Sequence, residues 1–195
     1  MKYLLVAIAA LAILFLISQA FSFRATNKVE GYSYDVVKRF DGFEIRKYEA
    51  AYFASYTMAT STYKESSSLG FRTLAGYIFG KNEEGVKMPM TSPVAMDISD
   101  SVTMRFLMPS NYDQESLPVP SDKNIRIEKR SEKLMAAITF GGWANDEKIA
   151  IYTAELKGLL KENNIKYKNE FSYFGYNPPF EVVNRRNEIV VEIEY

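Results

Sequence analysis

Four segments of this sequence alternate apolar and polar residues with a period of two. In one of them Val102 and Met104 alternate with Thr103 and Arg105. The four segments are residues 43–48, 102–108, 125–129 and 189–195. Successive side chains of a strand point to opposite faces of a sheet, so the alternation predicts antiparallel strands with one buried face.

Two other segments carry apolar residues at helical spacing. The first begins near Thr62, where Thr62 and Glu65 have the spacing of a capping box, and it ends around Gly80. The second begins at Asn145 or Asp146 and continues to the polar stretch KENN. Both segments predict amphipathic helices that cover a sheet.

The predicted elements fall into two similar halves, residues 34–108 and 125–195. Each half has the order ββαββ, and the two share an organisation without residue-level identity. Two such units that join their sheets make a closed or nearly closed antiparallel barrel with the helices packed outside. Closure also removes exposed sheet edges.

The N-terminus is the most apolar part of the chain. Lys2 is followed by an uninterrupted apolar run, residues 3–17, and then by the small-x-small pattern Ser18-Gln19-Ala20. This arrangement is typical of a cleaved secretory signal. No charge occurs in residues 3–23, a length close to the ~20 residues needed to span a bilayer, so an uncleaved anchor is the alternative.

Both alternatives predict an exported domain, either periplasmic or extracellular or attached to a membrane by residues 3–23. The expected organisation is a signal peptide or N-terminal membrane anchor over residues 1–23 and a polar linker over residues 24–31. Residues 32–195 then form one domain, because the remaining length is too short for two domains of ordinary size.

The absence of cysteine and histidine excludes whole classes of chemistry. Disulfides, thiolate nucleophiles, Ser-His-Asp catalysis, the usual zinc sites and the commonest haem ligand are all impossible. Carboxylates with tyrosines can still perform acid–base catalysis, but no spacing selects such a pair, so the sequence favours a ligand-binding protein over an enzyme. The 24 basic and 24 acidic residues give no large basic field, which argues against a nucleic-acid partner.

The stretch KMPMTSPVAM contains Met88, Met90 and Met96. One interpretation is thioether ligation of haem iron or Cu(I). The other is core packing, because Met88 and Met90 share one face if the segment is a strand and methionine fills irregular gaps. Core packing is the favoured interpretation.

Three separated stretches together resemble the SOUL haem-binding protein family. They are NEEGVKMPMTSPVAM (82–96), FGGWA (140–144) and GYNPPFEVVNRRNEIVVEI (175–193). The resemblance covers about residues 34–194 and implies an α+β fold. That fold is a distorted eight-stranded antiparallel β-barrel flanked by two α-helices, with two pseudo-repeated ββαββ halves, in agreement with the layout above.

The resemblance also implies non-covalent binding of haem, a related tetrapyrrole or a similar flat apolar ligand against the first helix. Histidine ligation is impossible here, so any iron ligand would be Tyr, Met, Lys or water. The family's contact positions fall at residues where this chain has other residue types: Ser68, Phe71, Ala75, Gly76 and, in a later loop, Glu181. This departure leaves a second hypothesis, in which the barrel binds a different small apolar ligand or a protein partner.

The candidate ligand-binding residues form an apolar face with cations at its rim. The apolar members are Tyr63, Phe71, Leu74, Tyr77 and Ile78. The cations that could pair with haem propionates are Lys64, Arg72 and Arg185.

Two further motifs have both a functional and a structural interpretation. The segments 177–179 and 185–188 either grip an anionic ligand or fix a loop, with the Arg-Arg-Asn-Glu stretch paired to a neighbouring strand. Gly141-Gly142-Trp143 is either a stacking platform or a tight turn with a packed Trp143. In both cases the structural interpretation is favoured.

Overall fold

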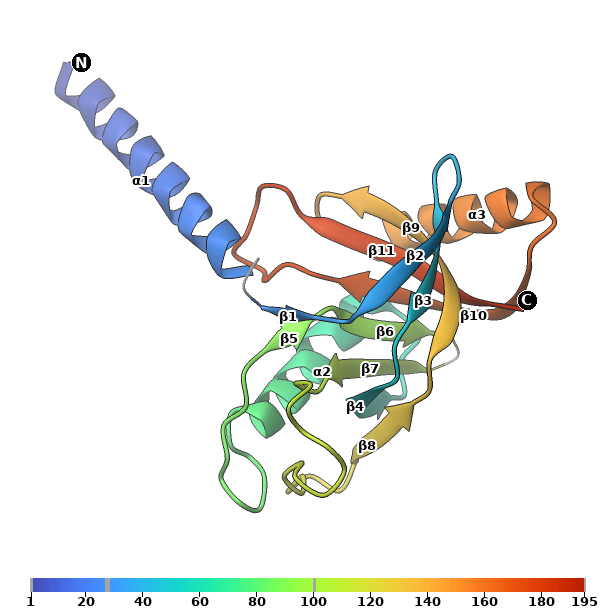
Figure 1. The fold of residues 1–195 in the computed structure, drawn as a ribbon. Coiled ribbons are helices and arrows are strands. Elements are labelled where there is room, and N and C mark those ends of the chain that lie inside the picture. The colour runs from blue at the N-terminus through green and yellow to red at the C-terminus, as the bar shows by residue number, and fades with distance from the viewer. Residues whose placement is uncertain (1, 27–28, 100, 195) are drawn as a thin grey trace.

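The computed structural model describes residues 2–26, 29–99 and 101–194 (Figure 1). The helices are α1 (Lys2–Thr26), α2 (Tyr63–Ile78) and α3 (Asp146–Glu162). The strands are β1 (Glu30–Gly31), β2 (Tyr34–Arg39), β3 (Glu44–Tyr48), β4 (Ala51–Met58), β5 (Thr91–Ser92), β6 (Val94–Ile98), β7 (Val102–Leu107), β8 (Ile125–Arg130), β9 (Lys133–Gly141), β10 (Lys166–Gly175) and β11 (Arg186–Glu194). The last position of the fourth alternating segment, Tyr195, lies outside the described residues.

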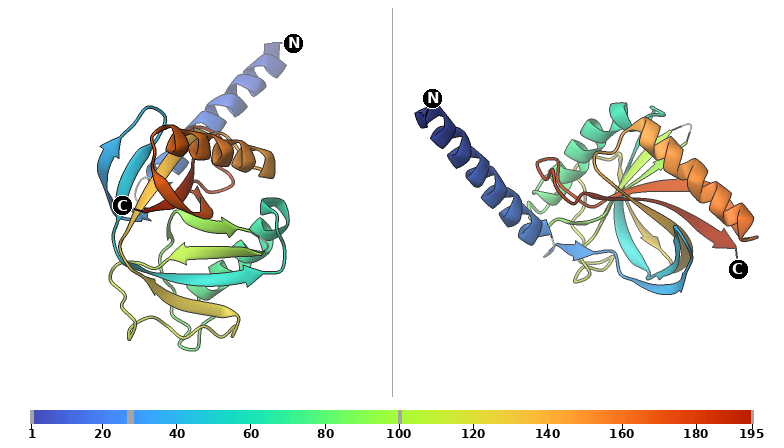
Figure 2. Two further views of the ribbon diagram at one scale, coloured as in Figure 1. Left: turned by 90° about the vertical axis from the view of Figure 1, so that its right-hand side faces the viewer. Right: turned by 90° about the horizontal axis from the view of Figure 1, so that it is seen from above.

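The predicted α+β fold is confirmed, as a curled antiparallel sheet with α2 and α3 packed on it (Figure 2). The strand order is β2-β3-β9-β11-β10-β6-β7-β4-β8. Eight of these strands form the predicted halves, and β2 is an addition that pairs with β3 at one edge. Over the described residues the order ends at β2 and β8, so the barrel is a curled open sheet and not a ring.

The two halves are related by an approximate two-fold symmetry in their strand pairing. The first is β3-β4-α2-β6-β7 and the second is β8-β9-α3-β10-β11. The first strand of each half pairs with the second strand of the other half: β3 with β9, and β8 with β4. The second strand of each half also pairs with the last strand of its own half: β4 with β7, and β9 with β11. Strands β6 and β10 pair with each other at the centre. The first strands of each half therefore pair with the opposite half.

Both helices begin where their capping residues predict. The Thr62 hydroxyl accepts a hydrogen bond from the backbone N–H of Glu65 at 3.3 Å, and the Asn145 side chain accepts one from the backbone N–H of Lys148 at 2.8 Å. Each bond satisfies a donor that has no partner within the helix. Helix α2 ends before Gly80, whose φ of 106° favours glycine.

The main core lies between the helices and one face of the sheet. Leu74 of α2 and Leu156 of α3 are fully buried there. Met88 and Met96 are only 3% and 1% exposed, and Met90 packs against the same cluster. The prediction that these methionines fill the core is confirmed.

The opposite face of the sheet is less polar than the alternation predicted. The curl of the sheet buries a second apolar cluster there: Tyr48, Ala95, Met135, Ala137, Phe174 and Val190. Arg105, which the alternation placed on a polar face, is only 8% exposed and pairs with Asp97 and, at 2.9 Å, with Glu128. A sheet that curls around its own face removes that face from water, which a single-strand pattern does not reveal.

A carboxylate clamp joins three adjacent strands on this face. Glu192 of β11 pairs with Lys133 of β9 and Lys168 of β10. Burial acts against the charge of this carboxylate, but the hydrogen bonds from Lys133 and Lys168 outweigh it and lower the pKa of Glu192.

The clamp predicts a pH-dependent loss of stability in acid. A folded-state pKa below the unfolded value of about 4.3 means that ionised Glu192 stabilises the fold above that pH. The stabilisation disappears as the pH falls through the lower folded-state pKa. Glu192→Gln should therefore lower the urea midpoint at neutral pH and flatten its decline in acid, measured by circular dichroism between about pH 7 and pH 3. If the urea midpoints of the wild type and the variant differ by the same amount at both ends of this pH range, ionised Glu192 is not the source of the pH dependence.

Helix α1 projects away from the domain (Figures 1 and 2). Its segment Lys2–Gln19 has a mean hydropathy of 2.1, and none of it is buried by the protein. By length and composition this segment can cross a membrane, and an N-terminal signal sequence meets the same criteria. The predicted linker is partly structured, because α1 continues to Thr26 and β1 pairs in parallel with β5. Residues 27 and 28 lie outside the described residues.

Candidate functional site

The apolar residues predicted as ligand contacts on the first helix fall into a buried group and a surface group. Leu74, Tyr77 and Ile78 are 0%, 0% and 1% exposed and belong to the main core. Their i, i+3, i+4 spacing directs them at strands β4 and β7, so their prediction as ligand contacts is corrected. They hold α2 against the sheet.

The other predicted residues of α2 lie at its surface. Phe71 is 38% exposed, and its ring lies 5.3 Å from the ring of Phe106 in the core. Tyr63 is partly buried, and Lys64 and Arg72 are exposed. Phe71, Lys64 and Arg72 are thus exposed on the same helix.

The start of α2 is fixed by the start of α3. The carboxylate of Asp146, in the first turn of α3, accepts hydrogen bonds from the backbone N–H groups of Tyr63 at 2.6 Å and Lys64 at 3.3 Å. The Tyr63 ring packs edge-on against Tyr173 of β10, with 5.2 Å between centroids. The predicted residue Tyr63 therefore lies at a junction of three elements.

Arg185 lies in the loop between β10 and β11, and its side chain organises that loop. Its guanidinium donates to the carbonyl oxygens of Asn177, Pro178 and Glu181 at 3.3, 2.8 and 2.6 Å. The guanidinium also lies over the Trp143 ring, 4.1 Å from its centroid. Arg185 is therefore primarily a loop residue, with one aromatic partner on the surface.

Trp143 is 50% exposed, which corrects the prediction that it is packed. The predicted tight turn is present, because Gly142 has a φ of 76°. The indole follows this turn at the surface, where Arg185 covers one side of the ring. Trp143 is therefore a surface aromatic. The motif FGGWA contains this residue, but the favoured interpretation of the motif placed its ring in a packed environment.

Tyr173 is the common neighbour of Tyr63 and Arg185. Burial raises the pKa of Tyr173 above its usual range, and Tyr63 adds to this effect while Arg185 opposes it. Burial likewise raises the pKa of Tyr77 to about 12. Both phenols therefore remain protonated near neutral pH, which makes them poor anionic ligands for a metal.

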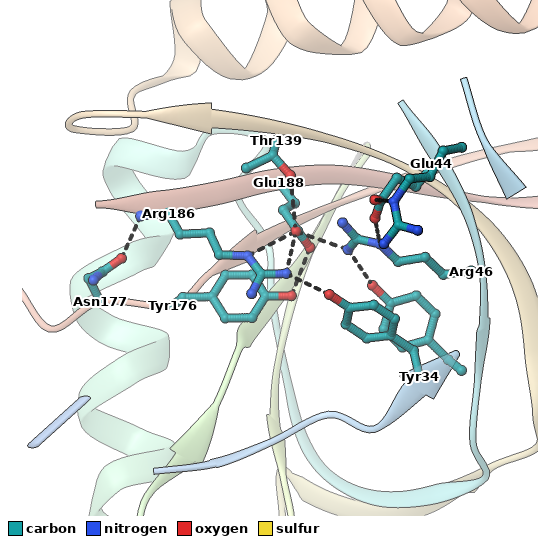
Figure 3. Close-up of polar contacts among 10 residues, drawn as sticks. Tyr34, Glu44, Arg46, Thr139, Tyr176, Asn177, Arg186 and Glu188 are labelled. Atoms are coloured by element: carbon teal, nitrogen blue, oxygen red, sulfur yellow. Dashed lines mark hydrogen bonds and ion pairs between the residues drawn. The ribbon is translucent and has the colours of Figure 1, made fainter. Parts of the chain in front are cut away.

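A second group of polar residues surrounds Glu188 on the other face of the sheet (Figure 3). Glu188 is fully buried and lies between Arg46, at 2.9 Å, and Arg186, at 2.7 Å. The hydroxyls of Tyr176 and Thr139 also donate to its carboxylate, at 2.7 and 3.2 Å. These donors come from β3, β9, the β10–β11 loop and β11 itself.

Aromatic rings and a loop amide complete this group. The guanidinium of Arg46 lies 4.5 Å from the centroid of the Tyr34 ring, and that of Arg186 lies 4.1 Å from the centroid of the Tyr176 ring. Arg186 also donates to the Tyr34 hydroxyl at 3.0 Å, and its backbone N–H donates to the side-chain oxygen of Asn177 at 2.6 Å. The Asn-Pro-Pro loop is thereby tied to the Glu188 group.

Two cations, Arg46 and Arg186, compensate the negative charge of the buried Glu188. Burial acts against the charged form of Arg46, but Glu188 and Tyr48 outweigh it and raise the pKa of Arg46. Burial and the nearby Glu188 together raise the pKa of the Tyr176 hydroxyl. The arrangement supports the structural interpretation of the Arg-Arg-Asn-Glu stretch, because its polar atoms bind partners on neighbouring strands.

The concave face of the sheet has little free space. The hollow lined by Tyr32, Phe53, Arg105 and Phe174 has a volume of about 40 Å³. Ligand pockets typically measure about 300–1,000 Å³, so a macrocycle does not fit there. A hollow of about 580 Å³, open to solvent, lies beside the C-terminal end of α3, and the predicted ligand contacts do not line it. Within residues 2–26, 29–99 and 101–194 no cluster of acidic side chains is suited to hold a metal ion.

Comparison with known proteins gives a consistent family match. Residues 29–192 match the family model described as SOUL heme-binding protein. Heme-binding protein 1 of Xenopus laevis is 31% identical over 155 residues, which cover 75% of this chain and 81% of that protein. Heme-binding protein 2 of Homo sapiens is 29% identical over 156 residues, which cover 75% of this chain and 76% of that protein.

Solved structures share the fold at much lower identity. The C-terminal domain of EcmrR superposes with a TM-score of 0.61 at 9% identity, over 83% of this chain and 98% of that domain. A protein described as a hydrolase from Listeria innocua superposes with a TM-score of 0.56 at 8% identity, over 78% of this chain and 91% of that one. At such identity the likeness concerns the fold alone.

Proposed function

Because this chain belongs to the SOUL heme-binding protein family, we propose that its domain binds haem or a related tetrapyrrole on the exposed surface of α2. Binding is non-covalent and proceeds without histidine, since the chain has none. The site comprises the apolar surface of Phe71 and Tyr63, with Lys64, Arg72 and Arg185 as the cations for the propionates.

One observation carries this proposal: Phe71 is 38% exposed on a fixed helix that also carries the exposed cations Lys64 and Arg72. Its neighbours Phe106 and the buried Leu74 anchor the helix, so the ring stays at the surface. A flat apolar ligand with two carboxylates matches an aromatic surface with cations at its edge. The hollow of about 40 Å³ inside the curl of the sheet favours this outer site over an inner one.

The residues present suit the macrocycle better than its iron. The buried hydroxyls of Tyr77 and Tyr173 are occupied by the Pro118 carbonyl at 2.8 Å and the Asn187 side chain at 2.8 Å. Bound haem would supply a redox-active iron. The chain's own residues contribute apolar contact, stacking and charge pairing with the propionates.

The location that we propose is outside the cytoplasm. Helix α1 either directs export and is removed or remains as a membrane anchor, and the segment Lys2–Gln19 meets the length and composition of both. The domain that follows α1 has its own core, so its ligand binding does not depend on which alternative holds.

Titration of residues 24–195 with haemin tests the proposal. The Soret absorbance should saturate at one haemin per chain with a Kd below ~1 μM. Trp143, the only tryptophan, should lose fluorescence over the same range, because it lies beside Arg185. Metal-free protoporphyrin IX should bind within about threefold of haemin if iron ligation contributes little. Weak uptake that does not saturate would reject the proposal.

The departures from the family's contact positions favour one alternative, a barrel that binds another small apolar ligand or a protein partner. At two of those positions, Ala75 and Glu181 are only 8% and 1% exposed, so they offer little to a surface ligand. Under this alternative neither porphyrin saturates, although the domain is folded by circular dichroism.

A further inference from the structure

The loop between β10 and β11, residues 176–185, carries an unusual number of exposed apolar side chains. Phe180, Val182 and Val183 are 67%, 47% and 49% exposed. Apolar side chains gathered at the tip of a fixed loop indicate a surface that contacts something apolar.

The backbone of this loop is held in one shape. Arg185 donates to three of its carbonyl oxygens, and the N–H of Glu181 donates to the carbonyl of Pro178 at 3.2 Å. The Glu181 side chain is buried, 1% exposed. With two prolines restricting the chain as well, Phe180 and the two valines point outward from a preformed scaffold.

The same loop is bonded to α1. The Gln19 side chain accepts a hydrogen bond from the N–H of Val182 at 2.9 Å, and its amide nitrogen donates to the carbonyl of Phe180 at 3.4 Å. Figure 1 shows this loop beside the C-terminal end of α1. Gln19 closes the apolar segment Lys2–Gln19, whose 18 residues extend about 27 Å as a helix, close to the ~30 Å of a bilayer's hydrocarbon core. A loop bonded to Gln19 therefore lies at the level where such a helix leaves the bilayer.

We propose that the β10–β11 loop rests on the membrane beside α1, with Phe180, Val182 and Val183 inserted among the lipids. The inference rests on the proposed membrane attachment of α1. The lipid surface is the occupant because the loop is hydrogen-bonded to Gln19, at the end of the apolar segment of that helix. Apolar side chains at a membrane interface add to the attachment and fix the orientation of the domain. Arg185 belongs both to this loop and to the proposed ligand site, so that site borders the membrane, where an apolar macrocycle partitions.

The cysteine-free chain permits a direct test. Val183→Cys is the test variant and Val119→Cys is its matched control, because both valines lie in loops and both are 49% exposed. Val119 lies in the β7–β8 loop and its backbone bonds to Glu83 and Glu84 between α2 and β5, a segment that Figure 1 shows on the side of the domain away from α1. The full chain, labelled at either cysteine with a nitrobenzoxadiazole fluorophore, is placed in phosphatidylcholine nanodiscs with one chain per disc. Doxyl-labelled lipid should quench position 183 by about twofold or more, with a blue-shifted emission, and leave position 119 unchanged.

Each outcome decides a separate point. Equal quenching at both positions overturns the lipid contact while the attachment of α1 stands. Blue-shifted emission at position 183 without lipid quenching shows burial against protein and also overturns it. A chain that fails to co-purify with the discs refutes the attachment and the inference together, whereas haemin titration of residues 24–195 tests ligand binding independently of either.

Discussion

Glu188→Ala is expected to lower the free energy of unfolding by about 3–5 kcal/mol, because it removes the buried carboxylate that pairs with the buried Arg46. Arg46 is only 3% exposed, and Glu188 is fully buried. For a domain of this size the loss corresponds to a fall in melting temperature of roughly 6–20 °C. Urea unfolding of residues 24–195, followed by circular dichroism, measures it.

Glu44→Ala is the matched control for this prediction. Glu44 and Glu188 each bind the guanidinium of Arg46 at 2.9 Å, but the Glu44 side chain is 26% exposed and that of Glu188 is 0% exposed. Water can replace the exposed partner, so Glu44→Ala should cost less than about 1 kcal/mol. Equal losses in the two variants would show that burial of the carboxylate does not set its contribution.

A double variant separates two contributions to the loss of stability: the loss of the Arg46–Glu188 ion pair and the cost of a buried arginine without its buried partner. Arg46→Met in the Glu188→Ala background removes the buried cation, so it should recover part of the stability. Arg186 can reach solvent, since 40% of its side chain is exposed. No recovery would mean that the group stabilises the fold chiefly through its packing.

Phe71→Asp is expected to weaken haemin binding by roughly 30–100-fold, because a carboxylate then faces the apolar macrocycle and repels its propionates. The variant should remain folded, as Phe71 is 38% exposed and the core residues of α2 are unchanged. Soret titration measures the affinity, and the melting temperature confirms that the domain is folded.

Two matched variants control for the introduced charge. Leu69→Asp places the same charge on α2 at a residue that is 46% exposed, and Ile151→Asp places it on α3 at a residue that is 52% exposed. A site on the Phe71 surface predicts a smaller effect at residue 69 and none at residue 151. Unchanged affinity in Phe71→Asp would move the ligand away from α2.

The fold was largely predictable because burial on one face leaves a period in the sequence. The alternating segments 43–48, 102–108, 125–129 and 189–195 correspond to β3, β7, β8 and β11. The halves were predicted with two strands before the first helix, and the first half has a third, β2. Strand β2 pairs with β3 alone and none of its residues is fully buried, so burial leaves no clear apolar period in it.

The site was less predictable, for two physical reasons. An apolar helical face has the same spacing whether it meets a sheet or a ligand, so Leu74 and Ile78 could not be distinguished from Phe71. Arg46 binds Glu188, which lies 142 positions further along the chain. A local sequence pattern cannot predict a contact between residues so far apart. Trp143 was visible in its motif, but the motif does not show whether the ring packs or lies at the surface, where it is 50% exposed.

The symmetric strand pairing described above has a consequence for folding kinetics. Strand β3 pairs with β9, and Glu44 lies opposite Ala137, so their separation is 137 − 44 = 93 residues. Strands β3 and β4 therefore remain without half of their partners until the second half of the chain has been synthesised. Sheets assembled from such distant segments fold in about milliseconds to seconds, far more slowly than helical bundles. A chain cut between β7 and β8 would give two fragments that fold only on each other, because each holds the neighbours that the other lacks.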